Sequence, residues 1–243
     1  MKVVVFAGPT LPADESQAFL PEATCSGPAA CGDVALAARE YDAIAIIDGY
    51  FHQRLSVWHK EILWALSRGV RVYGAASMGA LRAAELLDFG MVGVGQVFEW
   101  FRDGVLEDDD EVAIVHETAE RGYVARSDAM VNVRATLGRA RASGVVSRGT
   151  AEQLVALGKS MFFAQRSFPA LLAAAEARAV GGAELAALGR WLRDPRNLVD
   201  QKRSDAIALL RRVKQDLVET RAPEPPSFVF QYTEAWHELT RRL

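Results

Sequence analysis

Residues 70–90 read VRVYGAASMGALRAAELLDFG, and the order of residue types in this stretch decides the fold. Val70 to Ala76 is a largely apolar run with the length of a strand that is buried on both faces. Ser77 follows at once and can cap a helix, and the helical spacing of Met78 to Phe89 stops at Gly90. A strand that enters a helix so directly is typical of α/β proteins with a mainly parallel sheet.

The residues before this stretch repeat the alternation of strand and helix. Val3 to Ala7 is an apolar run that stops at Gly8-Pro9, and Ala43 to Asp48 is another that stops at Gly49. Helical patterns separate these runs at residues 33–40, with Asp33 as cap, and at 56–67, with Ser56 as cap. The sequence therefore predicts a mainly parallel sheet flanked by helices in three layers, Rossmann-like in outline.

The second half of the chain has a different composition, rich in Ala, Leu and Arg. Helical patterns lie at residues 127–142, 147–163, 168–179, 182–193, 203–219 and 232–243. We therefore predict an α/β domain at residues 1–125 that carries the active site. An all-helical region at 126–243 would pack on it or form a partner surface.

The composition of the chain disfavours two classes of protein, nucleic-acid binders and membrane-spanning proteins. Half of the 243 residues are hydrophobic and the formal net charge is −3, so nothing draws the chain to a nucleic-acid backbone. No apolar run approaches the roughly 18 residues of a membrane span, and the first apolar run is too short for a secretory signal. We expect a cytoplasmic protein. Cys25 and Cys31 lack C-x-x-C spacing, so no metal or cofactor is predicted.

Three segments are expected to meet at the carboxyl edge of the sheet, where ligands bind in parallel α/β proteins. They are Gly8-Pro9-Thr10, Asp48-Gly49 and the Gly74–Gly79 segment. In the last, Ser77 stands between small residues at a strand-to-helix turn, as in a nucleophile elbow, although Ala75 replaces the first glycine of G-x-S-x-G. Ser77 is then a nucleophile, with the N–H of Met78 to bind an oxyanion, or it is only the cap of its helix.

A reacting serine needs a base, and none of the four histidines has a recognised catalytic spacing. The chain contains many more arginines than lysines, yet position 60 is a lysine. A lysine can act as a base if burial favours its neutral form, whereas an arginine cannot. Val57 and Trp64 flank Lys60 at helical spacing, which predicts that Lys60 is largely buried and close to Ser77. The alternative is a solvated surface lysine. Asp48 would orient Lys60 or cap a turn.

The remaining polar candidates have supporting roles. His59 and Glu61 are expected at the surface or behind the reacting groups. The run from Glu107 to Glu111 holds five successive carboxylates, which diverge along any regular backbone, so one metal site cannot use most of them. Asp108, Asp109 and Asp110 are therefore predicted to form a solvated face or a docking patch.

Several motifs together resemble the TfuA-like family. They are IIDGYF at residues 46–51, VWHKEIL at 57–63, GAASMGALRAAEL at 74–86, FGM at 89–91, GVG at 93–95 and DDDEVA at 108–113, with a looser match at VNVR, 131–134. The resemblance covers about residues 3–137. It implies a companion of YcaO-family enzymes, which activate peptide amides with ATP, in the installation of thioamides.

The resemblance also implies a reaction and a partner. A TfuA-like protein is thought to hydrolyse the C-terminal thiocarboxylate of a ubiquitin-like sulfur carrier with a Ser-Lys pair. On this chain the pair falls on Ser77 and Lys60. Small residues would let an extended carrier tail approach the backbone closely at Gly8, Gly49, Gly74, Ala75 and Ala76. The N–H groups of Met78 and Thr10 would offset the charge of the substrate. Gly79 and Asp48 would also lie at the substrate, and Trp64 would lie behind the lysine.

Two other functions stay open from the sequence. The first is a non-enzymatic adaptor that docks on the YcaO enzyme and enhances its engagement of the peptide, with Ser77 and Lys60 merely structural. The second is a nucleotide-binding domain that uses Gly8-Pro9-Thr10, although the chain has neither G-x-G-x-x-G nor a P-loop.

Overall fold

The computed structural model describes residues 1–51, 54–219, 226–241 and 243, which form two compact units. One unit, the sheet unit, comprises Met1–Glu107 and Lys202–Leu243, and the other, the helical unit, comprises Asp108–Gln201. This division differs from the boundary predicted between residues 125 and 126. The difference arises because the last part of the chain returns to the sheet instead of extending the helical region.

The sheet has five strands, all parallel, in the order β2-β1-β3-β4-β5. Their bounds are β1 Val3–Phe6, β2 Ala23–Ser26, β3 Ala43–Ile46, β4 Arg71–Ala75 and β5 Val92–Val94. The order reverses between β1 and β3, and ligands of doubly wound sheets bind beside such a point, outside the carboxyl ends of the strands. The parallel sheet confirms the predicted α/β class.

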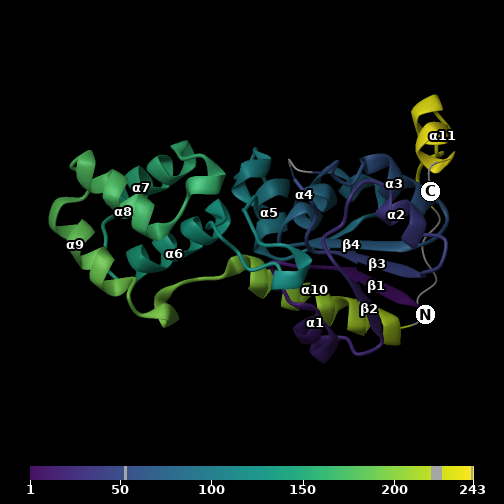
Figure 1. The fold of residues 1–243 in the computed structure, drawn as a ribbon, viewed down its shortest axis with the longest axis horizontal. Helices are drawn as coiled ribbons and strands as arrows, with labels where there is room; N and C mark the ends of the chain where they lie inside the picture. Colours follow the sequence, from purple (N-terminus) through teal and green to yellow (C-terminus); the bar gives the residue numbers. More distant parts are fainter. Residues whose placement is uncertain (52–53, 220–225, 242) are drawn as a thin grey trace. The chain divides into compact units, whose positions relative to one another are not determined.

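Helices cover both faces of this sheet (Figure 1). Alternate residues of β1, β3 and β4 pack in one core with Leu11, Leu20 and the buried face of α10. On the opposite face lie α2, α3 and α4, and α4 packs on β4 and β5 and against α5. The bounds are α1 Ala13–Phe19, α2 Asp33–Ala37, α3 His59–Ser67, α4 Met78–Glu85, α5 Gln96–Arg102, α10 Gln201–Val218 and α11 Glu234–Arg241, with a 3-10 turn, η1, at Leu87–Phe89.

Helix α3 begins three residues later than predicted. Its cap is built by Glu61, whose Oε1 accepts the backbone N–H of Trp58 at 3.1 Å, so Ser56 remains outside the helix. Asp33 likewise does not cap its helix, because its carboxylate accepts the N–H of Ala30 at 2.7 Å. The short elements β2, β5, α1 and α5 were absent from the sequence-based expectation, since runs of three to seven residues give little periodic signal.

The helical unit contains α6 Met130–Ala142, α7 Arg148–Ser160, α8 Phe168–Ala177 and α9 Gly182–Trp191, with 3-10 turns η2 Asp109–Glu111, η3 Ala119–Arg121, η4 Phe163–Gln165 and η5 Pro195–Asn197. Its core includes Leu137, Leu154 and Leu188. Ser147 caps α7 and Ser167 caps α8. No helix in the described part of the chain is long and apolar enough to cross a membrane.

Candidate functional site

The turn between β4 and α4 is strained. Ala76 is fully buried and has a φ of 66°, which an L-residue with a side chain rarely adopts. The N–H of Ser77 bonds to the carbonyl of Ala75 at 2.7 Å, closing a three-residue γ-turn around Ala76. Strain of this kind is concentrated at functional sites, because the surrounding structure must hold it in place.

Ser77 stands at the head of α4 and is 3% exposed. Its hydroxyl makes no capping hydrogen bond, so the alternative that Ser77 serves only as a helix cap loses its support. Its carbonyl accepts from Ala80, which starts the helix. Within the described residues, no hydrogen bond uses the N–H of Met78, so this donor is available at the helix N-terminus.

The glycines around this turn serve close packing. A Cβ at Gly79 would lie 1.7 Å from the carbonyl oxygen of Ile46, and one at Gly74 would lie 2.0 Å from the carbonyl oxygen of Gly79. A Cβ at Gly49 would lie 2.7 Å from Cγ of Met78. The space that these glycines provide is therefore filled by the chain itself, which corrects the prediction that Gly49 and Gly74 leave room for a substrate tail.

Asp48 joins the loops after β1 and β3 and is 2% exposed. Its Oδ2 accepts the N–H groups of Gly8 at 3.0 Å and Thr10 at 2.9 Å, and its Oδ1 accepts the Thr10 hydroxyl at 2.6 Å. The ammonium of Lys202, on α10, lies 3.9 Å from Oδ1. Asp48 thus caps a turn and pairs with Lys202 rather than Lys60. The N–H of Thr10 is occupied and does not serve as an oxyanion donor.

Lys60 occupies the first turn of α3 and is half-buried, not largely buried as predicted. Its Nζ lies 5.1 Å from the ring centroid of Phe230, in the C-terminal segment, a contact that attracts the cation. Trp64 packs on Trp236 of α11, with ring centroids 5.5 Å apart. In the described part of the chain no hydrogen bond joins Lys60 to Ser77, so the predicted pair forms only if Lys60 moves.

His59 and Glu61, the neighbours of Lys60, have separate structural partners. His59 is exposed, and its Nε2 lies 2.8 Å from Oε2 of Glu85 on α4. Burial opposes ionisation of Glu85, but hydrogen bonds from His59 and Arg82 outweigh it and lower the carboxyl pKa below its usual value. The Arg82 guanidinium also donates to the carbonyl of Val57 at 3.0 Å. These contacts tie the start of α3 to α4.

Glu61 is fully buried and organises the loop before α2. Its Oε2 accepts the N–H groups of Gly32 at 2.8 Å and Ala35 at 3.3 Å. Burial raises the pKa of the Glu61 carboxyl despite these hydrogen bonds. Burial, with the nearby Glu61 and Asp33 carboxylates, also raises the pKa of the Cys31 thiol to about 11. Cys31 is therefore protonated at neutral pH and unsuited to nucleophilic sulfur transfer.

Three carboxylates of the acidic run, Glu107 to Glu111, form ion pairs with basic side chains inside the helical unit. Asp110 pairs with Lys159 and with the fully buried Arg166, whose Nη2 is 2.7 Å from Oδ2, and Glu111 pairs with Arg134 at 2.7 Å. Asp108 pairs with Lys159 at 3.0 Å and stays exposed, as does Asp109. Only Asp108 and Asp109 of the three predicted docking residues therefore present exposed carboxylates. No potential metal cluster of His, Cys, Asp or Glu occurs among the described residues.

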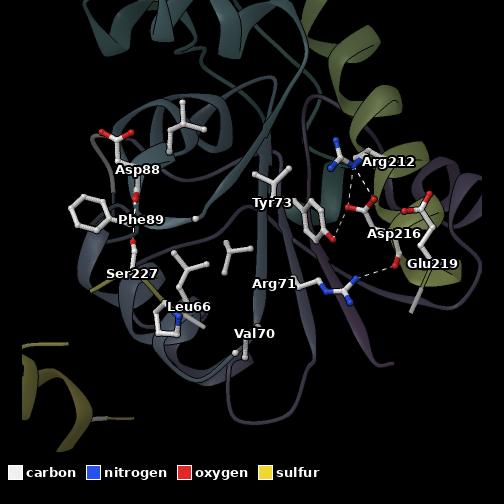
Figure 2. Close-up of a pocket in the computed structure, with 16 residues that line it drawn as sticks. Leu66, Val70, Arg71, Tyr73, Asp88, Phe89, Arg212, Asp216, Glu219 and Ser227 are labelled. Carbon is white, nitrogen blue, oxygen red and sulfur yellow. Dashed lines mark hydrogen bonds and ion pairs between the residues drawn. The ribbon is translucent and has the colours of Figure 1, made fainter. Parts of the chain in front are cut away.

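A cavity of about 430 Å³ lies at the amino end of β4, away from the Ser77 turn. Figure 2 shows Tyr73 and Arg212 directed at Asp216 from opposite sides. Their contacts to the Asp216 carboxylate measure 3.1 and 2.9 Å, and Arg71 donates to the carbonyl of Asp216 at 2.9 Å. These polar groups bond to one another, and Ser77 is not among the residues that line the cavity.

Lys202 and Asp205 were not among the predicted site residues, and α10 brings both to the carboxyl edge. Asp205 is buried, and its Oδ2 accepts the N–H of Val97 at 2.7 Å, which caps α5 from another helix. The signal that marks Lys202 is its helical spacing: it lies four residues before Ala206, on the apolar face that continues with Leu209 and Val213.

Fold and site together define a doubly wound α/β protein with a serine at a strained strand-to-helix turn beside the switch point. Residues 48–167 match the family model described as TfuA-like protein, and this match starts at Asp48 and includes the whole Ser77 turn. The matched residues therefore identify this half of the chain as TfuA-like, as its motifs indicated. The comparison with curated proteins gave no match.

Proposed function

We propose that this TfuA-like protein is an accessory hydrolase of peptide thioamidation. It would release sulfide from the C-terminal thiocarboxylate of a ubiquitin-like carrier protein and supply it to a YcaO-family enzyme. The family match supports the pathway and the YcaO partner. The observation that carries the hydrolase proposal is the strained γ-turn at Ala76, which presents a hydroxyl without a capping bond beside the available N–H of Met78.

The proposed reaction has two steps. Lys60, acting as base, takes the proton of Ser77 while Oγ attacks the terminal carbonyl carbon, and the N–H of Met78 offsets charge on the carbonyl oxygen. The C–S bond breaks, the sulfur leaves with its electron pair and takes the proton from Lys60 to become HS⁻, and the carrier remains as an ester on Ser77. Water then hydrolyses the ester to the carrier carboxylate and restores the hydroxyl. For the first step Lys60 must leave the ring of Phe230 and approach Ser77.

Sulfide release from a thiocarboxylated carrier tests the proposal. We expect Ser77→Ala to reduce the rate by about 1,000-fold or more, and Lys60→Ala by about 100-fold, because each removes a group that takes part in the transition state. Matched controls are Ser67→Ala, whose hydroxyl bonds to the carbonyl of Trp64 in its own helix, and Lys214→Ala on the exposed face of α10. Wild-type rates for Ser77→Ala would refute the hydrolase.

One observation favours the alternative function, a non-enzymatic adaptor that docks on the YcaO enzyme. Asp109 is exposed next to two carboxylates that bind inside the helical unit, so its charge is free to meet a partner. Asp109→Lys changes this surface without breaking an ion pair among the residues that the structure describes. If Asp109→Lys abolishes thioamidation by the YcaO enzyme while carrier hydrolysis is unchanged, docking is a separate role. Unchanged thioamidation would remove the acidic run from consideration.

A further inference from the structure

The C-terminal strap, residues 226–241 and 243, lies on the sheet unit and is fastened near both of its ends. Phe228 packs edge-on against Phe89 of η1, with ring centroids 5.5 Å apart. At the other end, a Cβ on Gly32 would lie 2.7 Å from Cδ2 of Leu243, so this side chain rests against the loop before α2. None of the described strap residues belongs to the core cluster that β1, β3, β4 and α10 form. The strap is therefore attached to the outside of that core.

Between these ends the strap packs on one face of α3. Lys60 and Trp64 are four residues apart, so they lie one turn apart on the same face of the helix. The ring centroid of Phe230 is 5.1 Å from Nζ of Lys60, and that of Trp236 is 5.5 Å from the ring centroid of Trp64. The rings of Phe230 and Trp236 also pack on each other, 5.3 Å apart. The two aromatic side chains of the strap thus form one unit that covers Lys60 and Trp64.

The contact with Phe230 is unsuited to the reaction proposed for Lys60. The negative face of an aromatic ring attracts an ammonium group. Among the described residues, Lys60 has no hydrogen bond or ion pair that would compete with this contact. A base must instead present a lone pair to the Ser77 hydroxyl, within hydrogen-bond reach. The docked strap therefore holds Lys60 in a position from which it cannot take the proton of Ser77.

Helix α11 is anchored in a way that allows the strap to leave. The helix has eight residues, and an isolated helix of this length is not stable in water. Of its described residues only Trp236 is buried, at 2% exposure, while neighbours such as His237 and Glu238 are exposed. A segment with so little buried apolar surface opens at a lower cost in free energy than the whole domain. Loss of the Trp236 contact would release α11 and Phe230 together.

We propose that the C-terminal strap is an autoinhibitory device of the Ser77 site. With the strap docked, Phe230 keeps Lys60 away from Ser77, and with the strap released, Lys60 is free to turn toward the serine. This inference rests on the proposed hydrolase function. The switch makes and breaks only non-covalent contacts, so the fraction of molecules with a released strap sets the rate of sulfide release.

Chemical labelling tests the hold on Lys60 without any catalysis. Acetylation by sulfosuccinimidyl acetate, followed over time by peptide mass spectrometry, reports how freely the Lys60 amine leaves the ring. We expect Trp236→Ala to raise the acetylation rate of Lys60 by about 3- to 10-fold, the factor by which a contact of this kind shifts an equilibrium. Lys214, exposed on α10, is the internal reference, and Val229→Ala, at an 80% exposed position next to Phe230, is the matched control. An unchanged rate in Trp236→Ala overturns the inference, whether or not the wild-type chain releases sulfide.

Sulfide release from a thiocarboxylated carrier gives the direction of the effect. We expect Trp236→Ala to raise kcat/KM by about 3- to 10-fold and Val229→Ala to match wild type. A lower rate in Trp236→Ala would show that the strap completes the site, and this result, like an unchanged rate, overturns the inference. Faster labelling of Lys60 without sulfide release from either protein would refute the hydrolase while supporting the hold of the strap on Lys60.

Phe230→Leu covers the case in which Trp236→Ala does not fold. Phe230 is half-buried, and leucine keeps an apolar contact with Trp236 while it removes the aromatic face that attracts Lys60. We expect Phe230→Leu to raise both the acetylation of Lys60 and the release of sulfide by about threefold. Wild-type values for both in a folded Phe230→Leu protein overturn the inference.

Discussion

Ala76 illustrates which properties of single residues the sequence reveals. The small residues before Ser77 predicted a sharp strand-to-helix turn, and the structure has that turn. The positive φ of Ala76 was not predictable, because alanine disfavours it and only the packing of β4, α4 and α10 imposes it. Lys202 was not predicted as a site residue for a related reason, because its partner Asp48 lies 154 residues earlier in the chain. Helical spacing places Lys202 on an apolar face but does not indicate what that face meets.

Cys31 gives a prediction at the scale of one residue. Since burial and the neighbouring carboxylates raise the pKa of its thiol to about 11, little thiolate exists at pH 8. We expect iodoacetamide to alkylate Cys31 roughly 100-fold more slowly than free cysteine, whose pKa is about 8.5. Peptide mass spectrometry over time measures this rate. Alkylation as fast as free cysteine would reopen a sulfur relay through Cys31.

At the scale of elements, contact between α4 and the two strands below it determines where Ser77 stands. Gly79 brings the helix backbone against the carbonyl of Ile46 at the end of β3, and Gly74 lies under the same helical turn. The sequence showed the order strand, serine, helix, but the glycines were interpreted as room for a substrate tail. Close approach of the chain to itself and close approach of a ligand require the same residue type, and only the structure distinguishes them.

Gly79→Ala tests this packing. Its Cβ would meet backbone atoms of β3, which cannot rotate away, so we expect a loss of about 3 kcal/mol in the free energy of unfolding. The control is Gly138→Ala in α6, where a Cβ meets nothing within 4 Å, and there we expect a gain of up to about 1 kcal/mol. Urea unfolding followed by circular dichroism measures both. Equal stability of Gly79→Ala and wild type would contradict the packing of α4.

At the scale of the whole molecule, the path of the chain departs most from the expectation. The Ala- and Leu-rich composition after residue 126 predicted one helical region, but α10 and α11 belong to the sheet unit. Residues Ala206, Leu209, Leu210 and Val213 bury the sheet face that β1, β3 and β4 present. A helix of this composition fits a helical bundle equally well, so its pattern alone does not identify the surface that it covers.

The helical unit carries a pH-dependent ion pair. Burial opposes ionisation of Asp110, but bonds from Lys159 and Arg166 outweigh it and lower the carboxyl pKa. A carboxyl group with a lowered folded-state pKa stabilises the fold above its unfolded pKa of about 4, and this stabilisation is lost as pH falls through the folded value. We expect Asp110→Asn to cost on the order of 2 kcal/mol at pH 7 and progressively less below pH 4, measured by urea unfolding.

Asp109→Asn is the matched control, because Asp109 is the exposed neighbour of Asp110. It should leave the unfolding free energy within about 0.5 kcal/mol of wild type at every pH. A cost of Asp110→Asn that does not change between pH 7 and pH 3 would show that the charge of Asp110 is not what stabilises the unit.

The central claim is that Ser77 attacks the carrier thiocarboxylate, and intact-mass spectrometry of an acid-quenched reaction tests it most directly. With thiocarboxylated carrier in excess, we expect an adduct of protein plus carrier minus H₂S, with the ester located by peptide mapping at Ser77. Ser77→Ala should show neither adduct nor sulfide. Rapid sulfide release by Ser77→Ala, or an adduct located at another residue, would contradict the account.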